Sequence, residues 1–112
     1  MNEYEIIYMI KYNNDDDAFA FMLKKYEKFI WKKIHSMYVY DEEKIDFFQE
    51  SMILLNKAIR TFDESYNKTF TRYFELILIR KLVSLKKETQ QYVLREPSFF
   101  YQLASPETQR ET

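Results

Sequence analysis

The residues best suited to recognition lie between 45 and 60, where helical spacing separates apolar from polar side chains. At 100° per residue, the apolar positions recur at steps of three and four and are predicted to pack inward: Ile45, Phe48, Met52, Leu55 and Ile59. The polar residues fall on another face and surround Ile53: Asp46, Gln49, Glu50, Asn56, Lys57 and Arg60. An apolar centre ringed by polar groups is typical of a helix that docks on a protein. Single exposed apolar residues are also common, so a docking face and a solvated face both fit.

A second helix is predicted from Phe70 to Leu85, and one strip of it mixes cations, a tyrosine and aliphatic residues. The strip spans about 120° of arc at helical spacing and comprises Arg72, Tyr73, Leu76, Arg80, Val83, Ser84 and Lys87. Cations suit phosphates, and a flat ring suits stacked bases. The alternative is an ordinary boundary strip whose cations extend into solvent.

The order of motifs from residue 46 to residue 82 resembles region 2 of the sigma-70 family of bacterial RNA polymerase specificity factors. The motifs are D-x-x-Q-E (46–50), K-A-I-R-x-F-D (57–63), F-x-x-Y (70–73) and F-E-L-x-x-x-R-K-L (74–82). The last of these is most similar to sporulation-type alternative sigma factors. The resemblance extends less sharply back to about residue 3.

This resemblance implies two interfaces. The first helix would dock on the coiled-coil clamp helices of the largest subunit of core RNA polymerase, through Asp46, Gln49, Glu50, Ile53, Asn56 and Arg60. The second would recognise and melt the promoter −10 element, mainly as non-template single strand, through Phe70, Arg72, Tyr73, Leu76, Arg80, Ser84 and Lys87. Phe70 has a second interpretation as a core residue, because it shares a face with Phe74 and Ile77.

The sequence departs from the family pattern in two places. Primary sigma factors carry a tryptophan pair that wedges the duplex open, and Leu76 and Ile77 stand there. The departure predicts weaker melting and stricter promoter choice. Nothing after residue 95 resembles the domain that reads the −35 element. Either the chain is one domain of a longer protein, or a separate subunit supplies that half, as in split sigma factors. A sigma-like module that binds polymerase without reading DNA, and restraint by an anti-sigma factor, remain alternatives.

Composition predicts an all-α fold, a compact bundle of three main helices plus a short N-terminal helix. The chain has 112 residues, no glycine, and only two prolines, both near the C-terminus, so little interrupts long helices. Helices are expected over residues 3–12, 18–38, 41–62 and from 70 to about 88, with Asp17 or a neighbour and Thr69 as caps. Residues 1–95 are expected to form one domain, and residues 96–112 a partly ordered tail.

The distribution of charge, the absence of cysteine and the single histidine limit the functions that are expected of the chain. The net charge is −1, yet residues 66–95 carry seven basic residues against two acids, a local balance of +5. About five phosphate contacts support only non-specific affinities on the order of 10⁻⁴ to 10⁻⁶ M, so a larger machine is expected to carry the domain to DNA. Cysteine is absent and His35 is the sole histidine, so no metal, cofactor or enzymatic activity is expected. No apolar run reaches the roughly 20 residues of a membrane span, and a soluble cytoplasmic protein is expected.

Overall fold

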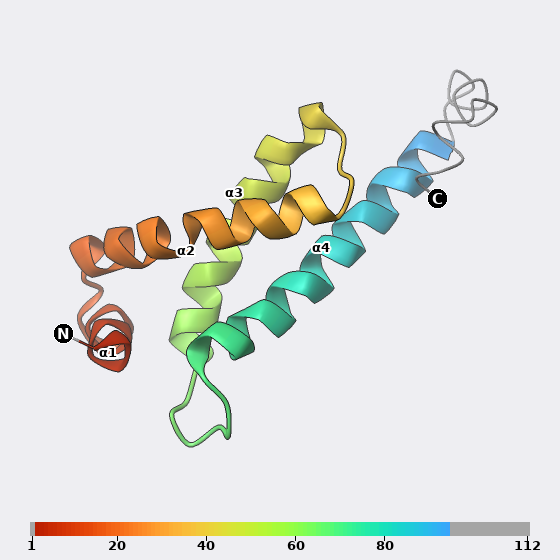
Figure 1. Cartoon of the computed structure of the whole chain (residues 1–112). Coiled ribbons are helices and arrows are strands. Elements are labelled where there is room, and N and C mark those ends of the chain that lie inside the picture. Colours follow the sequence, from red (N-terminus) through yellow and green to blue (C-terminus); the bar gives the residue numbers. More distant parts are fainter. Residues whose placement is uncertain (1, 95–112) are drawn as a thin grey trace.

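A computed structural model describes residues 2–94, with side chains as far as Thr89. This part of the chain forms four helices and no strand (Figure 1): α1 (Glu3–Asn13), α2 (Asp16–Ser36), α3 (Asp41–Thr61) and α4 (Phe70–Leu94). The all-α class is confirmed, with one short and three long helices; α4 continues to Leu94, beyond its expected end at about residue 88. The predicted domain end at residue 95 and the predicted tail lie outside the described residues.

The junction between α1 and α2 is tighter than predicted. Asn14 ends α1 in the left-handed conformation, with a φ of 49°, which asparagine tolerates better than most residues. The next residue, Asp15, begins α2 by accepting a hydrogen bond from the backbone N–H of Ala18 at 3.0 Å. The cap is therefore Asp15, and Asp17 lies inside the first turn of α2.

Thr69 caps α4, as predicted, because its Oγ1 accepts a hydrogen bond from the backbone N–H of Arg72 at 3.2 Å. Replacing Thr69 by alanine leaves that N–H without its side-chain acceptor and is expected to lower the free energy of unfolding by about 1 kcal/mol. Urea unfolding followed by far-UV circular dichroism measures the loss. Thr69→Ser keeps the hydroxyl, so equal urea midpoints for the alanine and serine variants would contradict a capping role.

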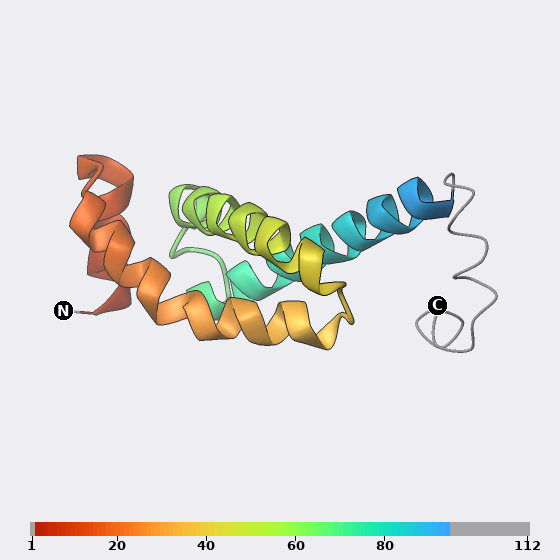
Figure 2. The same ribbon diagram turned by 90° about the horizontal axis from the view of Figure 1, so that it is seen from above.

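The four helices share one apolar core, in which α3 packs against α1, α2 and α4. The largest fully buried apolar side chains come from all four helices: Ile10, Met22, Ile30, Ile34, Leu55, Ile59, Phe70, Phe74, Leu78 and Leu82. In both views the C-terminal part of α4 extends beyond the other helices (Figure 1, Figure 2). The bundle therefore leaves one side of α3 and a long side of α4 without a helix partner.

The predicted inward face of α3 is correct at Leu55 and Ile59 and wrong at Ile45. Ile45 is 61% exposed, whereas Phe47 is buried. The buried side consists of Phe47, Ser51, Leu55, Ala58 and Ile59. Ser51 is fully buried because its hydroxyl donates to the carbonyl of Phe47 at 2.7 Å, which satisfies the polar group. The small side chains at 51 and 58 belong to this buried side, and Ile45 lies outside it.

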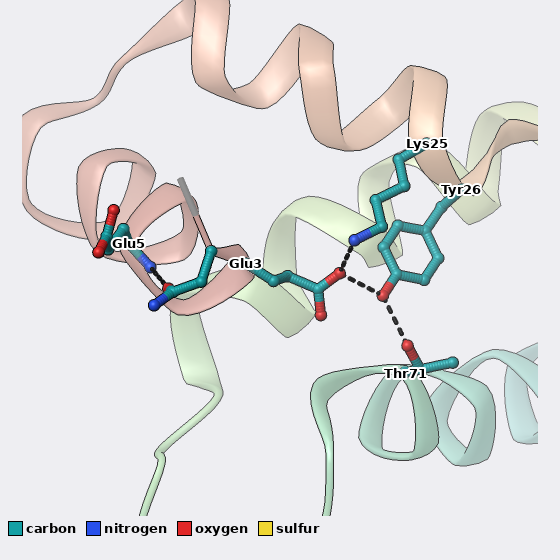
Figure 3. Close-up of polar contacts among 6 residues, drawn as sticks. Glu3, Glu5, Lys25, Tyr26 and Thr71 are labelled. Atoms are coloured by element: carbon teal, nitrogen blue, oxygen red, sulfur yellow. Dashed lines mark hydrogen bonds and ion pairs between the residues drawn. The ribbon is translucent and has the colours of Figure 1, made fainter.

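A polar network joins α1, α2 and the start of α4 (Figure 3). The Oε2 atom of Glu3 accepts from Lys25 Nζ at 2.6 Å and from the Tyr26 hydroxyl at 2.9 Å. The same hydroxyl lies 2.8 Å from Thr71 Oγ1 in the first turn of α4. Burial raises the pKa of Tyr26, so its hydroxyl remains protonated, donates to Glu3 and accepts from the Thr71 hydroxyl. The network fixes the end of α4 where the mixed strip begins.

Candidate interaction surfaces on α3 and α4

The polar residues of α3 and Ile53 lie on one outward side of the helix. We call this surface the α3 face and define it as Asp46, Gln49, Glu50, Ile53, Asn56 and Arg60. Ile53 is 65% exposed and lies opposite the buried side, at the centre of the face. Glu50 and Asn56 are half-buried and the other members are exposed. Arg60 Nε donates to Asn56 Oδ1 at 3.1 Å, which orients two polar groups one turn apart.

The α3 face continues into a hollow against the C-terminal half of α4. The hollow has a volume of about 360 Å³ and is lined on the α3 side by Asp46, Gln49, Glu50 and Ile53, among others. Leu85, Glu88 and Thr89 line its α4 side. An apolar side chain beside carboxylates and an amide, in a shallow depression, matches the composition of a protein-docking surface. Ile45 adds a second exposed apolar group at the edge of the α3 face.

The mixed strip lies on the outer side of α4, opposite the buried row of Phe70, Phe74, Leu78 and Leu82. We call it the α4 strip and keep the seven members named above. Five of them are exposed: Arg72, Arg80, Val83, Ser84 and Lys87. Tyr73 and Leu76 are half-buried. The helix thus brings the predicted cations and the tyrosine onto one surface.

Phe70 does not belong to that surface. Its side chain is 1% exposed, and its ring centroid lies 5.4 Å from that of Phe62 and 5.7 Å from that of Tyr26. These edge-to-face contacts hold the ring inside the core. The structure therefore places Phe70 in the core, in agreement with the second of its two interpretations, and not among the exposed residues predicted to contact DNA.

Tyr73 is fixed by aromatic neighbours that periodicity did not reveal. Its ring centroid lies 5.3 Å from that of Phe62 and 5.5 Å from that of Tyr66, and its hydroxyl lies 2.8 Å from Thr61 Oγ1. Tyr66, in the connection between α3 and α4, is 45% exposed. The pair of Tyr66 and Tyr73 offers two rings at the start of the α4 strip. The only signal for Tyr66 in the sequence is an aromatic residue within an otherwise polar turn.

Arg72 is held by an acid that sequence reasoning also missed. Its Nη1 lies 2.6 Å from Glu75 Oε1, and Lys33 Nζ of α2 lies 2.9 Å from Glu75 Oε2. The hydrogen bond from Lys33, and to a smaller extent that from Arg72, lowers the pKa of the Glu75 carboxyl. Because Lys33 also pairs with Glu75, the Glu75 carboxylate keeps one ion-pair partner when Arg72 binds another anion.

No helix within residues 2–94 is long and apolar enough to cross a membrane.

Two relatives match the chain. RNA polymerase sigma-H factor from Bacillus subtilis (strain 168) is 33% identical over 78 residues, which are 69% of this chain and 36% of that protein. RNA polymerase sigma-H factor from Bacillus licheniformis is 30% identical over 92 residues, which are 81% of this chain and 41% of that protein. The matched part thus spans less than half the length of either relative. No protein-family model and no solved structure matches the chain. Both relatives are sigma factors and both matches cover more than two thirds of this chain, so the similarity supports a sigma-70 family sigma factor region.

Proposed function

We propose that this region attaches a sigma factor to core RNA polymerase through the α3 face and contacts the opened promoter −10 element through the α4 strip. The relatives are named as RNA polymerase factors, which supports polymerase as the partner of the α3 face. The observation that carries the proposal is the outward placement of two different surfaces on adjacent, mutually packed helices. Adjacent surfaces allow one domain to bind both partners at the same time.

The chemistry of the α3 face supports docking on a basic coiled coil such as the polymerase clamp. Asp46 and Glu50 supply carboxylates, and Gln49 supplies an amide that can donate and accept. Carboxylates paired with arginines give specificity and orientation as well as affinity. Ile53, at the centre, is placed to be desolvated by the partner, and buried apolar anchors at the centre of an interface contribute most of the affinity.

The chemistry of the α4 strip supports contact with a single strand. Arg80 and Lys87 are exposed cations on the same side as Tyr73, so phosphates and a base can be engaged together. Arg72 would exchange Glu75 for a phosphate, since Lys33 keeps the carboxylate paired. Leu76 can separate bases but stacks poorly, which favours weak melting and strict promoter choice.

Few cations line the strip, so DNA affinity is expected to depend on polymerase. Three arginine or lysine side chains neutralise about three phosphates, and such contacts alone give only weak, salt-sensitive binding. The second candidate function, a module that binds polymerase without reading DNA, rests on the half-buried state of Tyr73 and on Leu76 in the place of an aromatic wedge.

Tyr73→Ala is expected to weaken sequence-dependent binding of single strands by about 5- to 150-fold, because stacking on one aromatic ring contributes about 1–3 kcal/mol per base. Single strands with a randomised −10 window are first selected for binding to core polymerase and the chain together. Fluorescence anisotropy then compares labelled strands of the selected sequences with labelled strands of the randomised pool. Tyr73→Phe is the matched control, because it keeps the ring and loses only the hydroxyl contact with Thr61.

Arg80→Ala is expected to weaken all sequences about equally and to reduce the slope of log K against log salt by about 0.7, the value for one single-strand phosphate. Lys24→Ala, at an exposed position on α2, should change neither quantity. If the parent chain shows no sequence-dependent binding of single strands while polymerase binding persists, the second candidate function is correct. If the parent chain binds and both Tyr73→Ala and Arg80→Ala bind like it, the α4 strip is not the DNA contact.

A further inference from the structure

Three tyrosines form an exposed row on α1 that neither proposed interface uses. Tyr4, Tyr8 and Tyr12 recur every four residues and are 40%, 61% and 62% exposed. The ring centroids of Tyr8 and Tyr12 are 4.6 Å apart, and the Tyr4 ring stacks at 6.1 Å on that of Phe62. We call Tyr4, Tyr8 and Tyr12 the tyrosine ridge. A contiguous exposed aromatic row is unusual on a solvated surface and is typical of an interaction site.

Two surface depressions adjoin the tyrosine ridge, and carboxylates line both of them. The two depressions, of about 440 and 360 Å³, lie between α1 and the start of the α3–α4 connection, and both are lined by Tyr4, Tyr8 and Glu64. Glu5 lines the first and Asp63 the second. Within residues 2–94, neither Glu5 nor Glu64 takes part in an ion pair. Aromatic faces beside unpaired carboxylates are a site for a cation.

One cation already lies on the ridge. Lys11 Nζ is 5.7 Å from the centroid of the Tyr12 ring, within the range of a cation–π contact. Its ammonium group also donates to the carbonyl of Phe62 at 2.9 Å, so this cation is retained by the fold. Among the residues that line the two depressions, Lys11 is the sole base. Tyr4 and Tyr8 therefore face the carboxylates without a cation of their own.

The negative charge around the tyrosine ridge determines whether a nucleic acid or a basic protein segment can bind there. Single-stranded nucleic acid stacks on aromatic rings only where a positive groove follows its backbone, and here Glu5, Asp63 and Glu64 would repel phosphates. The backbone N–H of Ser65 donates to Asp63 at 2.9 Å and lowers its pKa, so that carboxylate stays ionised at neutral pH. An arginine side chain suits both the exposed rings and the carboxylates, because its guanidinium stacks on an aromatic face and binds carboxylates in a bidentate manner.

We propose that the tyrosine ridge docks an arginine-bearing segment of a partner protein, with the guanidinium against Tyr8 and between Glu5 and Glu64. The surface contains no member of the α3 face or the α4 strip. The inference therefore goes beyond the proposed function and does not depend on it. Lysine is expected to bind more weakly, since its ammonium group is compact and strongly hydrated.

The test uses four probes on the purified 112-residue chain with tyrosine rings labelled for NMR. The probes are three twelve-residue peptides identical except for arginine, lysine or glutamate at four positions, and an oligothymidine. The arginine peptide is expected to shift the ring signals of Tyr8 and Tyr12 at about 150 mM salt and to bind at least threefold more tightly than the lysine peptide. The difference in affinity is expected to be larger still for the glutamate peptide and the oligothymidine.

Matched variants locate the binding. Glu5→Gln combined with Glu64→Gln, and separately Tyr8→Ala combined with Tyr12→Ala, are each expected to weaken the arginine peptide at least tenfold. Tyr38→Ala, at a 74% exposed tyrosine just after the C-terminal end of α2, should leave affinity unchanged. The four changed residues are all exposed, so each variant is expected to fold, and circular dichroism checks this. Equal binding by the ridge variants, preference for oligothymidine, or no shift of the Tyr8 and Tyr12 rings would overturn the proposal.

Discussion

Replacing Ile53 by arginine is expected to abolish stable binding of the chain to core RNA polymerase, with a loss of affinity of at least a hundredfold. Ile53 is 65% exposed at the centre of the α3 face, and a hundredfold loss equals about 2.7 kcal/mol, within the range of a central hot spot. Arginine there would bury a charge without a designed partner. It would also oppose the basic surface that Asp46 and Glu50 are proposed to meet.

The measurement is co-purification and fluorescence titration with core polymerase. Ile53→Arg leaves the fold intact, because surface substitutions usually change stability by no more than about 0.5 kcal/mol, and circular dichroism verifies this. Gln49→Ala and Glu50→Ala are expected to weaken binding less, because each removes a polar contact nearer the rim of the face.

Ile45→Arg is the matched control, since Ile45 is an isoleucine of the same helix with 61% exposure. It lies at the edge of the α3 face, two turns from Ile53, and its replacement is expected to cost less than tenfold. If Ile45→Arg were as harmful as Ile53→Arg, the centre of the interface would lie nearer the start of α3. If neither weakened binding, polymerase would contact another surface.

The helices of this bundle were predictable because their signals are local. No glycine interrupts the chain, apolar residues recur at helical spacing, and Asp15 and Thr69 supply side-chain caps at short range. Caps and periodicity depend on residues three or four positions apart, and a single sequence contains that information.

The inward side of α3 was less predictable because burial depends on neighbouring helices. Periodicity weighted the large side chain of Ile45, which the structure exposes, and gave no weight to Ser51, which the structure buries. A small residue signals close helix approach only when the partner helix is known. The outward position of Ile53 survived this error, since it lies opposite the true buried side.

The partners of the α4 strip could not be predicted from spacing on α4 alone. Lys33 of α2 and Glu75 determine how Arg72 is held, and Tyr66 from the preceding connection packs on Tyr73. Packing of the bundle brings Lys33 to Glu75 and Tyr66 to Tyr73, whereas Arg72 and Glu75 are neighbours three positions apart on α4. Helical spacing predicted that the cations of the α4 strip face outward, but not the ion pairs and ring contacts that fix the geometry of the strip.

Phe74→Ala is expected to lower the free energy of unfolding by about 3–5 kcal/mol, the usual range for deleting a buried phenylalanine ring. Phe74 is fully buried, and its ring contacts those of Tyr26, Phe29 and Phe70, with centroids 5.7, 6.1 and 6.1 Å away. It therefore joins α2 to the helix that carries the α4 strip. Small domains have a total stability of about 5–15 kcal/mol, so the variant should be only marginally folded at 37 °C.

Urea unfolding of the Phe74 variants also tests whether the core organises α4. Phe74→Leu keeps most of the apolar volume and is expected to cost less than about 1.5 kcal/mol, so it remains measurable if Phe74→Ala fails to fold. Phe21→Ala removes the same ring from a 56% exposed position on α2 and should change stability by no more than about 0.5 kcal/mol. Equal losses for Phe21→Ala and Phe74→Ala would contradict the helix packing described above. Because Phe74 lies on the side of α4 opposite the strip, a folded Phe74→Leu chain that binds single strands like the parent would separate the role of the core from that of the strip.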